Sequence, residues 1–148
     1  MITAMTSDHV PSVAALEKLC FSDPWSEQSI MAELNNPLSL WLVAVEEDRV
    51  VGYIGSQTVP PESDVMNVAV DPKFRRRGLA EQLVLSLVEQ LQSAGNTSLT
   101  LEVRASNAPA IALYHKLGFI QVGRRPNYYR NPREDALILR KDFAAPLD

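Results

Sequence analysis

The chain has 148 residues, 46% of them hydrophobic, and a formal net charge of −4 at pH 7. This length suits one domain with a hydrophobic core, and the apolar content excludes an intrinsically disordered chain. The negative charge argues against general nucleic-acid binding, and no apolar run is long enough to cross a bilayer. We therefore expect a single cytoplasmic domain over residues 1–148, acting as a monomer with no nucleic-acid or membrane partner. The single cysteine, Cys20, excludes an internal disulfide.

The first half of the chain alternates between strand-like and helix-like segments. Residues 1–5 predict a short strand, and residues 10–20 carry apolar side chains at helical spacing, interrupted by the polar Glu17. Ser26 is placed to cap a second helix, which the Asn-Asn-Pro run at 35–37 ends. Three apolar strands are expected to follow, over residues 38–45, 49–58 and 64–70.

The second half begins with a long amphipathic helix after Gly78, for which Gly95 is the expected C-terminal cap. Residues 98–104 alternate between apolar and polar side chains, which predicts a strand with one buried face. Asn107 is placed to cap a short helix that Gly118 ends. Two last strands are predicted over residues 119–123 and 136–139, joined by a polar loop at 124–134. This order of elements predicts an α/β fold, a mixed sheet with helices on both faces.

The loop between residues 70 and 79 has the features of an anion site. A strand ends at Asp71-Pro72, arginines occupy positions 75–77, and Gly78 opens the helix. The first N–H groups of a helix lack internal partners, the helix dipole adds positive charge there, and arginine suits phosphate oxygens. The loop lacks the Gly-Lys-Ser/Thr end of a Walker loop and the three glycines of the dinucleotide fingerprint. A diphosphate site of another kind is therefore predicted, although a solvated basic turn would have the same composition.

The remaining pattern, Arg75-x-x-Gly78-x-Ala80, resembles the pyrophosphate loop of the GNAT acetyltransferases. The segments 101–107 and 112–119 are similar to the second signature half of that fold. Together with Pro24-Trp25-Ser26, Asn127-Tyr128-Tyr129 and Glu134-Asp135-Ala136, they resemble the RimI-type branch. Enzymes of that branch acetylate the N-terminal alanine of a small-subunit ribosomal protein.

The resemblance implies a mostly antiparallel sheet of about seven strands with about four flanking helices and a V-shaped splay between the two central strands. It implies acetyl-CoA as co-substrate, with its pantetheine arm in the V against main-chain groups of the strand before the basic loop. Main-chain amides of that loop would bind the pyrophosphate. The implied cofactor-binding residues are Val68, Ala69, Val70, Arg75, Arg76, Arg77, Gly78, Leu79, Ala80, Glu81 and Asn107.

The resemblance also assigns Glu102 as general base and Tyr114 as general acid. An N-terminal amine, with a pKa of about 7.7–8.0, must lose a proton before it attacks a thioester, and a carboxylate can take that proton. A phenol with a pKa near 10 can protonate the departing thiolate. No metal ion is required. From the residues alone, Glu102 is more readily a charge on the solvent face of its strand, and Tyr114 is equally a core aromatic.

The resemblance gives Tyr128 and Tyr129 a role in shaping a peptide groove, although both could be ordinary loop aromatics. Three functions therefore stay open. The chain could acetylate the N-terminal alanine of a ribosomal protein, it could acetylate a small amine such as a polyamine, drug or metabolite, or it could bind acyl-CoA without catalysis. The presence of both an acid and a base candidate argues against the third.

Overall fold

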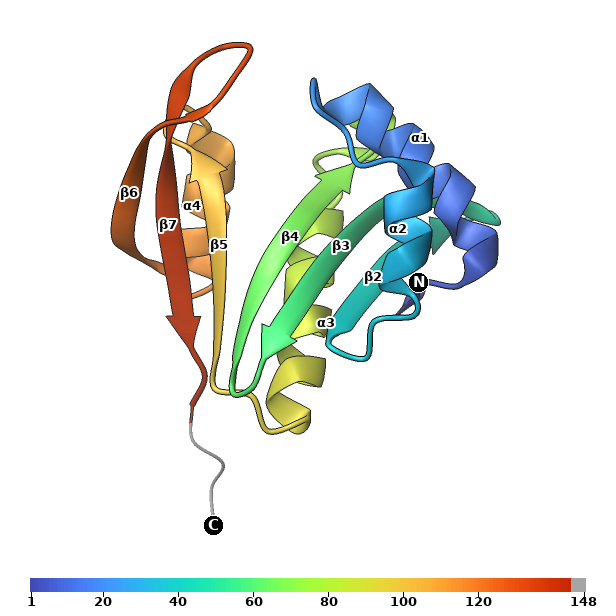
Figure 1. Ribbon diagram of the computed structural model, residues 1–148, viewed down its shortest axis with the longest axis horizontal. Helices are drawn as coiled ribbons and strands as arrows, with labels where there is room; N and C mark the ends of the chain where they lie inside the picture. The colour runs from blue at the N-terminus through green and yellow to red at the C-terminus, as the bar shows by residue number, and fades with distance from the viewer. Residues whose placement is uncertain (145–148) are drawn as a thin grey trace.

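Residues 1–144, the part of the chain that the structure describes, form one mixed sheet with helices on both faces in this computed structural model (Figure 1). Within these residues, seven strands pair in the order β1-β2-β3-β4-β5-β7-β6. The strands are β1 Ile2–Ala4, β2 Ser39–Glu46, β3 Arg49–Val59, β4 Glu62–Val70, β5 Ser98–Arg104, β6 Ile120–Tyr129 and β7 Glu134–Asp142. The α-helices are α1 Val10–Cys20, α2 Glu27–Glu33, α3 Leu79–Ser93 and α4 Ala108–Lys116, with short 3-10 helices η1 Ser7–His9 and η2 Pro72–Phe74. The predicted α/β fold and its order of elements are confirmed.

Local sequence signals mark the starts of α2, α3 and α4. Ser26 accepts a hydrogen bond from the Ser29 N–H at 3.0 Å at the start of α2, and Asn107 accepts one from the Ala110 N–H at 3.3 Å at the start of α4. Both are the N-caps that the sequence predicted. Gly78 precedes α3 with a φ of 76°, a conformation that a residue with a Cβ adopts only at a cost. None of the helices within residues 1–144 is long and apolar enough to cross a membrane.

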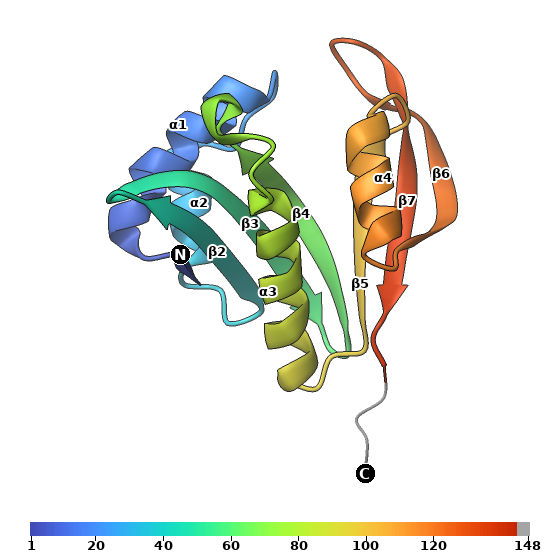
Figure 2. The ribbon, with the colours of Figure 1, turned by 180° about the vertical axis from the view of Figure 1, so that it is seen from behind.

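Each face of the sheet is covered by a different pair of helices. Figure 2 shows α3 and α4 in front of the sheet, and Figure 1 shows α1 and α2 in front of its other face. Successive residues of β2 point into different cores: Leu42 belongs to the core on one face of the sheet, and Val43 belongs to the core on the other. On the α1 face, Trp41 stacks on Tyr53 with 6.1 Å between ring centroids. Trp41 lies so close to Gly55 that a Cβ there would be 2.3 Å from the indole, so this position must be glycine.

The parallel strands β4 and β5 pair at one end only, where residues 62–64 lie opposite residues 98–100. Beyond that point the two strands separate, as Figure 1 shows. The register of β4 against β3 shifts between Gly55 and Ser56, which leaves Met66 as an extra residue in β4. A bulge of this kind bends its strand and increases the local twist, so it turns the second half of β4 away from β5. This splay is the V that the resemblance implied.

One expectation was wrong. The segment 124–134 was predicted to be a polar loop, whereas β6 continues to Tyr129 and β7 begins at Glu134. Arg124 and Arg125 pair in register with β7 residues, so the polar stretch is strand up to a tight turn. Because β6 is the edge strand of the sheet, its polar side chains can stay in solvent, and hydrophobic alternation does not reveal it.

Candidate active site

The second half of β4 carries main-chain groups that face an opened sheet. The Asp71 N–H donates to the Val51 carbonyl of β3 at 2.8 Å. Main-chain groups of an antiparallel strand point alternately toward and away from the partner strand. Those of Val68 and Val70 therefore point away from β3, toward the side from which β5 has diverged. The Val68 N–H is 3.2 Å from the side-chain oxygen of its neighbour Asn67. This edge can offer main-chain partners to an extended ligand arm.

The start of α3, directly after β4, is open to an anion. No side chain caps the helix at Gly78, so the first main-chain N–H groups of α3 keep their hydrogen-bonding capacity for a ligand. A Cβ built at Gly78 would have only the Gln82 side-chain nitrogen within 4 Å, at 3.9 Å, so the space in front of the loop is empty of protein. Arg76 also has a positive φ, 66°, which turns the loop around this point. The residues present fit a phosphate-bearing ligand such as acetyl-CoA.

The three consecutive arginines have different partners. Arg75 folds back onto the end of β4, where its Nε donates to the Val70 carbonyl at 3.2 Å. Arg77 lies over the Phe74 ring, 4.9 Å from its centroid, and 3.7 Å from a Glu46 carboxylate oxygen. Arg76 has no ion pair within residues 1–144. The sequence predicted all three to contact the cofactor. Of the three, Arg76 is the one whose guanidinium has no side-chain or main-chain partner within residues 1–144.

Other predicted cofactor residues hold the loop and its surroundings together. The side chains of Ala69 and Leu79 are buried in the two cores. Glu81 pairs with Lys116 at 3.2 Å, which ties the first turn of α3 to α4. The Asn107 side chain serves as the helix cap described above. What these residues can offer a cofactor is therefore mainly their main chain.

Glu102 lies on the face of β5 that points away from α4. Its Oε1 is 3.2 Å from the Arg125 Nε, and its Oε2 is buried without a hydrogen-bond partner in the described structure. Burial raises the pKa of Tyr129 to about 12, and the nearby Glu102 carboxylate adds to the shift. Burial and the same carboxylate also raise the pKa of Tyr128. The carboxylate thus has one oxygen paired with Arg125 and one buried oxygen without a partner within residues 1–144.

Tyr114 of α4 lies on the other face of β5. Its side chain is buried in the core that α3 and α4 cover, and its ring meets Phe119 edge to face at 5.6 Å. Burial raises the pKa of Tyr114 to about 12. The phenol therefore stays protonated at neutral pH, which suits a general acid. Its packing is equally that of a core aromatic.

Tyr128 and Tyr129 are the last two residues of β6. Their rings meet edge to face at 5.1 Å. The Arg104 guanidinium lies over Tyr129, 4.4 Å from its centroid, and that of Arg125 lies over Tyr128 at 5.7 Å. The structure thus brings both tyrosines close to Glu102.

Sequence reasoning missed Arg125 as the ion-pair partner of Glu102, and nothing in its local sequence singles it out. It also missed Glu17, which was read only as an interruption of an apolar stripe. Glu17 is fully buried, and its Oε1 accepts a hydrogen bond from the Asn67 side chain at 2.7 Å. A carboxylate inside an apolar helical stripe was the signal that could have identified it.

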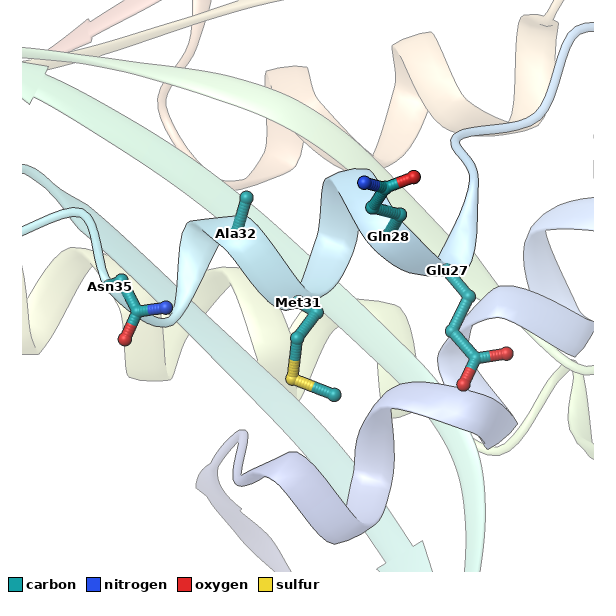
Figure 3. Close-up of a pocket in the computed structure, with 5 residues that line it drawn as sticks. All are labelled: Glu27, Gln28, Met31, Ala32 and Asn35. Carbon is teal, nitrogen blue, oxygen red and sulfur yellow. The ribbon is translucent and has the colours of Figure 1, made fainter.

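A depression on α2, drawn in Figure 3, is lined by none of the site residues described above. It is lined by Glu27, Gln28, Met31, Ala32 and Asn35. It is shallow and open, and its lining comes from one helix and the residues after it, so it offers no convergent catalytic groups. Across residues 1–144, no group of three or more His, Cys, Asp or Glu side chains could hold a metal ion.

Residues 10–119 match the model of the acetyltransferase (GNAT) family. The chain belongs to this family. This GNAT protein is 39% identical over 141 residues to the [ribosomal protein bS18]-alanine N-acetyltransferase of Salmonella typhimurium. The aligned region covers 93% of this chain and 94% of that relative. It is 37% identical over 136 residues to the putative enzyme of the same name from Bacillus subtilis, covering 91% of this chain and 90% of the relative.

A solved structure of the same kind supports the assignment. The crystal structure of the ribosomal-protein-S18-alanine N-acetyltransferase from Escherichia coli matches this GNAT chain with a TM-score of 0.91 and 33% identity. The match covers 100% of this chain and 96% of the other. The protein is an N-acetyltransferase, as the motifs predicted.

Proposed function

We propose that this protein transfers the acetyl group of acetyl-CoA to the N-terminal alanine of ribosomal protein bS18, in the cytoplasm. The proposal rests on relatives that share more than a third of their residues with this chain over nearly their whole length and carry that activity in their names. The structural observation that carries it is the splay between β4 and β5, with Glu102 and Tyr114 on opposite faces of β5. A thioester held between the two strands would have a base candidate on one side and an acid candidate on the other.

Acetyl-CoA would be held mainly by main-chain groups. The N–H groups between Arg76 and Glu81 suit its two linked phosphates, and the Arg76 charge adds to the attraction. The edge of β4 at Val68 and Val70 suits the amide-bearing pantetheine arm. The bound thioester would supply an acetyl group already activated for transfer to an amine.

The side chains on the two faces of β5 would move the protons. Glu102 Oε2 would take a proton from the alanine ammonium, directly or through a water, while Arg125 holds Oε1. The neutral amine then attacks the acetyl carbon, and a main-chain N–H on the open edge of β4 is available to the oxygen that becomes negative. As the carbon–sulfur bond breaks, the Tyr114 hydroxyl would give its proton to the departing thiolate sulfur. The phenolate would then recover a proton, through water, from the attacking nitrogen, which loses its second proton as the amide forms. No covalent bond to the protein is needed.

The test is acetylation of a peptide that carries the N-terminal sequence of bS18, followed by mass spectrometry of the intact peptide. We expect a gain of one acetyl group, located on the α-amine by fragmentation. The matched control is the same peptide with a blocked N-terminus, which should stay unmodified. Faster turnover of polyamines or other small amines than of the peptide would instead support the small-amine function. Binding of CoA without transfer to any amine would support a non-catalytic role.

A further inference from the structure

Glu17 is a buried carboxylate that takes no part in the proposed reaction, and it contacts the splayed half of β4 through Asn67. Glu17 of α1 is 0% exposed, and its Oε2 has no hydrogen-bond partner within residues 1–144. Burial raises the pKa of Glu17, and the hydrogen bond from Asn67 opposes that shift. The Tyr53 hydroxyl, also buried, lies beside it, and burial together with the Glu17 charge raises the pKa of that phenol. Burying such a group is unfavourable, so its place in the fold needs a reason.

The partner of Glu17 stands at a sensitive point of β4. Asn67 directly follows the bulge residue Met66 and directly precedes Val68. Its Nδ2 donates to Glu17 Oε1 at 2.7 Å, and its Oδ1 accepts from the Val68 N–H at 3.2 Å. A single side chain therefore connects α1 to the first main-chain group that faces the splay.

On that side the second half of β4 is held by side chains only, among them Arg75, whose Nε donates to the Val70 carbonyl at 3.2 Å. This half of the strand has lost β5 as a neighbour, and a bulge interrupts its ladder with β3. An edge strand with a disrupted ladder can shift, and a fixed ligand geometry needs it held. One turn after Glu17, Cys20 Sγ lies 4.0 Å from the Val70 carbonyl. The last two turns of α1 thus reach β4 at Asn67 and again at Val70.

We infer that Glu17 is a positioning residue: acting through Asn67, it fixes the splayed half of β4 so that the main-chain groups of Val68 and Val70 are in place for the acetyl-CoA arm. This inference rests on the proposed function for its catalytic consequence. Its consequence for CoA binding is independent of which amine is acetylated.

The chain contains a matched control in Glu33 of α2. Glu33 is 8% exposed and also accepts a hydrogen bond from a side-chain amide, that of Gln57, at 2.7 Å, together with one from the Trp41 indole N–H at 3.3 Å. Gln57 pairs with Asp64, at the closed end of the V and before the bulge. Removing Glu33 therefore disrupts a comparable buried bond without loosening the splayed half of β4.

The experiment compares Glu17→Met, Glu17→Gln and Glu33→Met in the full chain. Melting temperature, CoA affinity by calorimetry, and kcat and KM for the bS18 peptide are measured for each. Both Met variants should lower the melting temperature. Only Glu17→Met should weaken CoA binding, by about tenfold, and lower kcat, by about 10- to 100-fold. Glu17→Gln should recover most of both, because its amide oxygen can still accept from Asn67.

A second variant keeps the inference testable if Glu17→Met does not fold. Asn67→Leu removes the same hydrogen bond from the less buried partner and should reproduce the loss of CoA affinity. Where both single variants fold, the double variant should lose no more than either, because the residues act as one unit. CoA affinity and kcat within about twofold of Glu33→Met, for either variant, would overturn the inference. If the wild type fails to acetylate the peptide, the proposed function fails, and the CoA titrations still decide the role of Glu17.

Discussion

The two strands that form the V present different chemistry to the space between them. β4 and the loop after it present mainly main-chain groups, at Val68, Val70 and the start of α3, while their nearby side chains are engaged inward. β5 and its neighbours present side chains, the carboxylate of Glu102 on one face and the phenol of Tyr114 on the other. In the proposed function, β4 and its loop bind the cofactor through main-chain groups, and β5 and its neighbours transfer protons through side chains. Substitutions on the two sides should therefore change different kinetic constants.

The sharpest test of the β5 side is Glu102→Gln. The amide keeps the shape and can still accept from Arg125, but it cannot take a proton. We expect kcat to fall by about 10²- to 10⁴-fold with CoA affinity unchanged, because general-base catalysis contributes on that order. Steady-state kinetics together with calorimetric titration separate the two quantities. Wild-type turnover in this variant would remove Glu102 from the mechanism.

Tyr114→Phe tests the opposite face. Removing the hydroxyl should lower kcat by about 100-fold, at the lower end of the range for acid–base groups, and should leave the core packing intact. Because burial raises the folded-state pKa of Tyr114 from 10 to about 12, the phenol keeps its proton, and its contribution to stability, below pH 10. Both are lost as the pH rises through about 12. The wild-type kcat should therefore show no decline attributable to Tyr114 between pH 7 and 10, and a drop in that range that disappears in the Phe variant would contradict this assignment.

On the β4 side, Gly78→Val should act on binding instead. The φ of 76° disfavours a β-branched residue, and the side chain would fill the space in front of the loop. CoA affinity should fall by about tenfold or more, which corresponds to about 1.4 kcal/mol, while kcat at saturating acetyl-CoA stays near the wild-type value. Gly95→Val is the control, since Gly95 also has a positive φ, 92°, but ends α3 far from the loop. Equal CoA affinity in both variants would argue against a diphosphate site here.

The smallest expected effect is at Arg125, which holds Glu102. Arg124 provides a closely matched control, because the two side chains are 56% and 54% exposed and each pairs with a carboxylate that is 27% exposed. Arg125→Met should lower kcat by about three- to tenfold through loss of orientation, and Arg124→Met should leave it unchanged, since exposed ion pairs contribute at most about 1 kcal/mol to stability. Equal kcat values for the two variants would show that Glu102 needs no anchor.

Much of the fold could be predicted because its signals are local. The caps at Ser26 and Asn107, the glycine before α3 and the alternation of residues 98–104 depend on neighbours only a few positions away. The edge strand β6 could not be predicted in the same way. Its polar second half forms a strand only because β7 pairs with it, and a strand with solvent on its outer edge needs no apolar pattern.

The candidate site likewise has features that local sequence signals predict and features that depend on tertiary contacts. The sequence by itself determined the order of elements, the glycine and the arginines of the loop before α3, and the residue types available for proton transfer. Only the tertiary structure decided that Arg125 pairs with one Glu102 oxygen and that Glu17 meets Asn67 across 50 residues. These contacts join segments that lie far apart in the chain. Their existence depends on the pairing of β5, β7 and β6 and on the packing of α1 on β4, which no local pattern encodes.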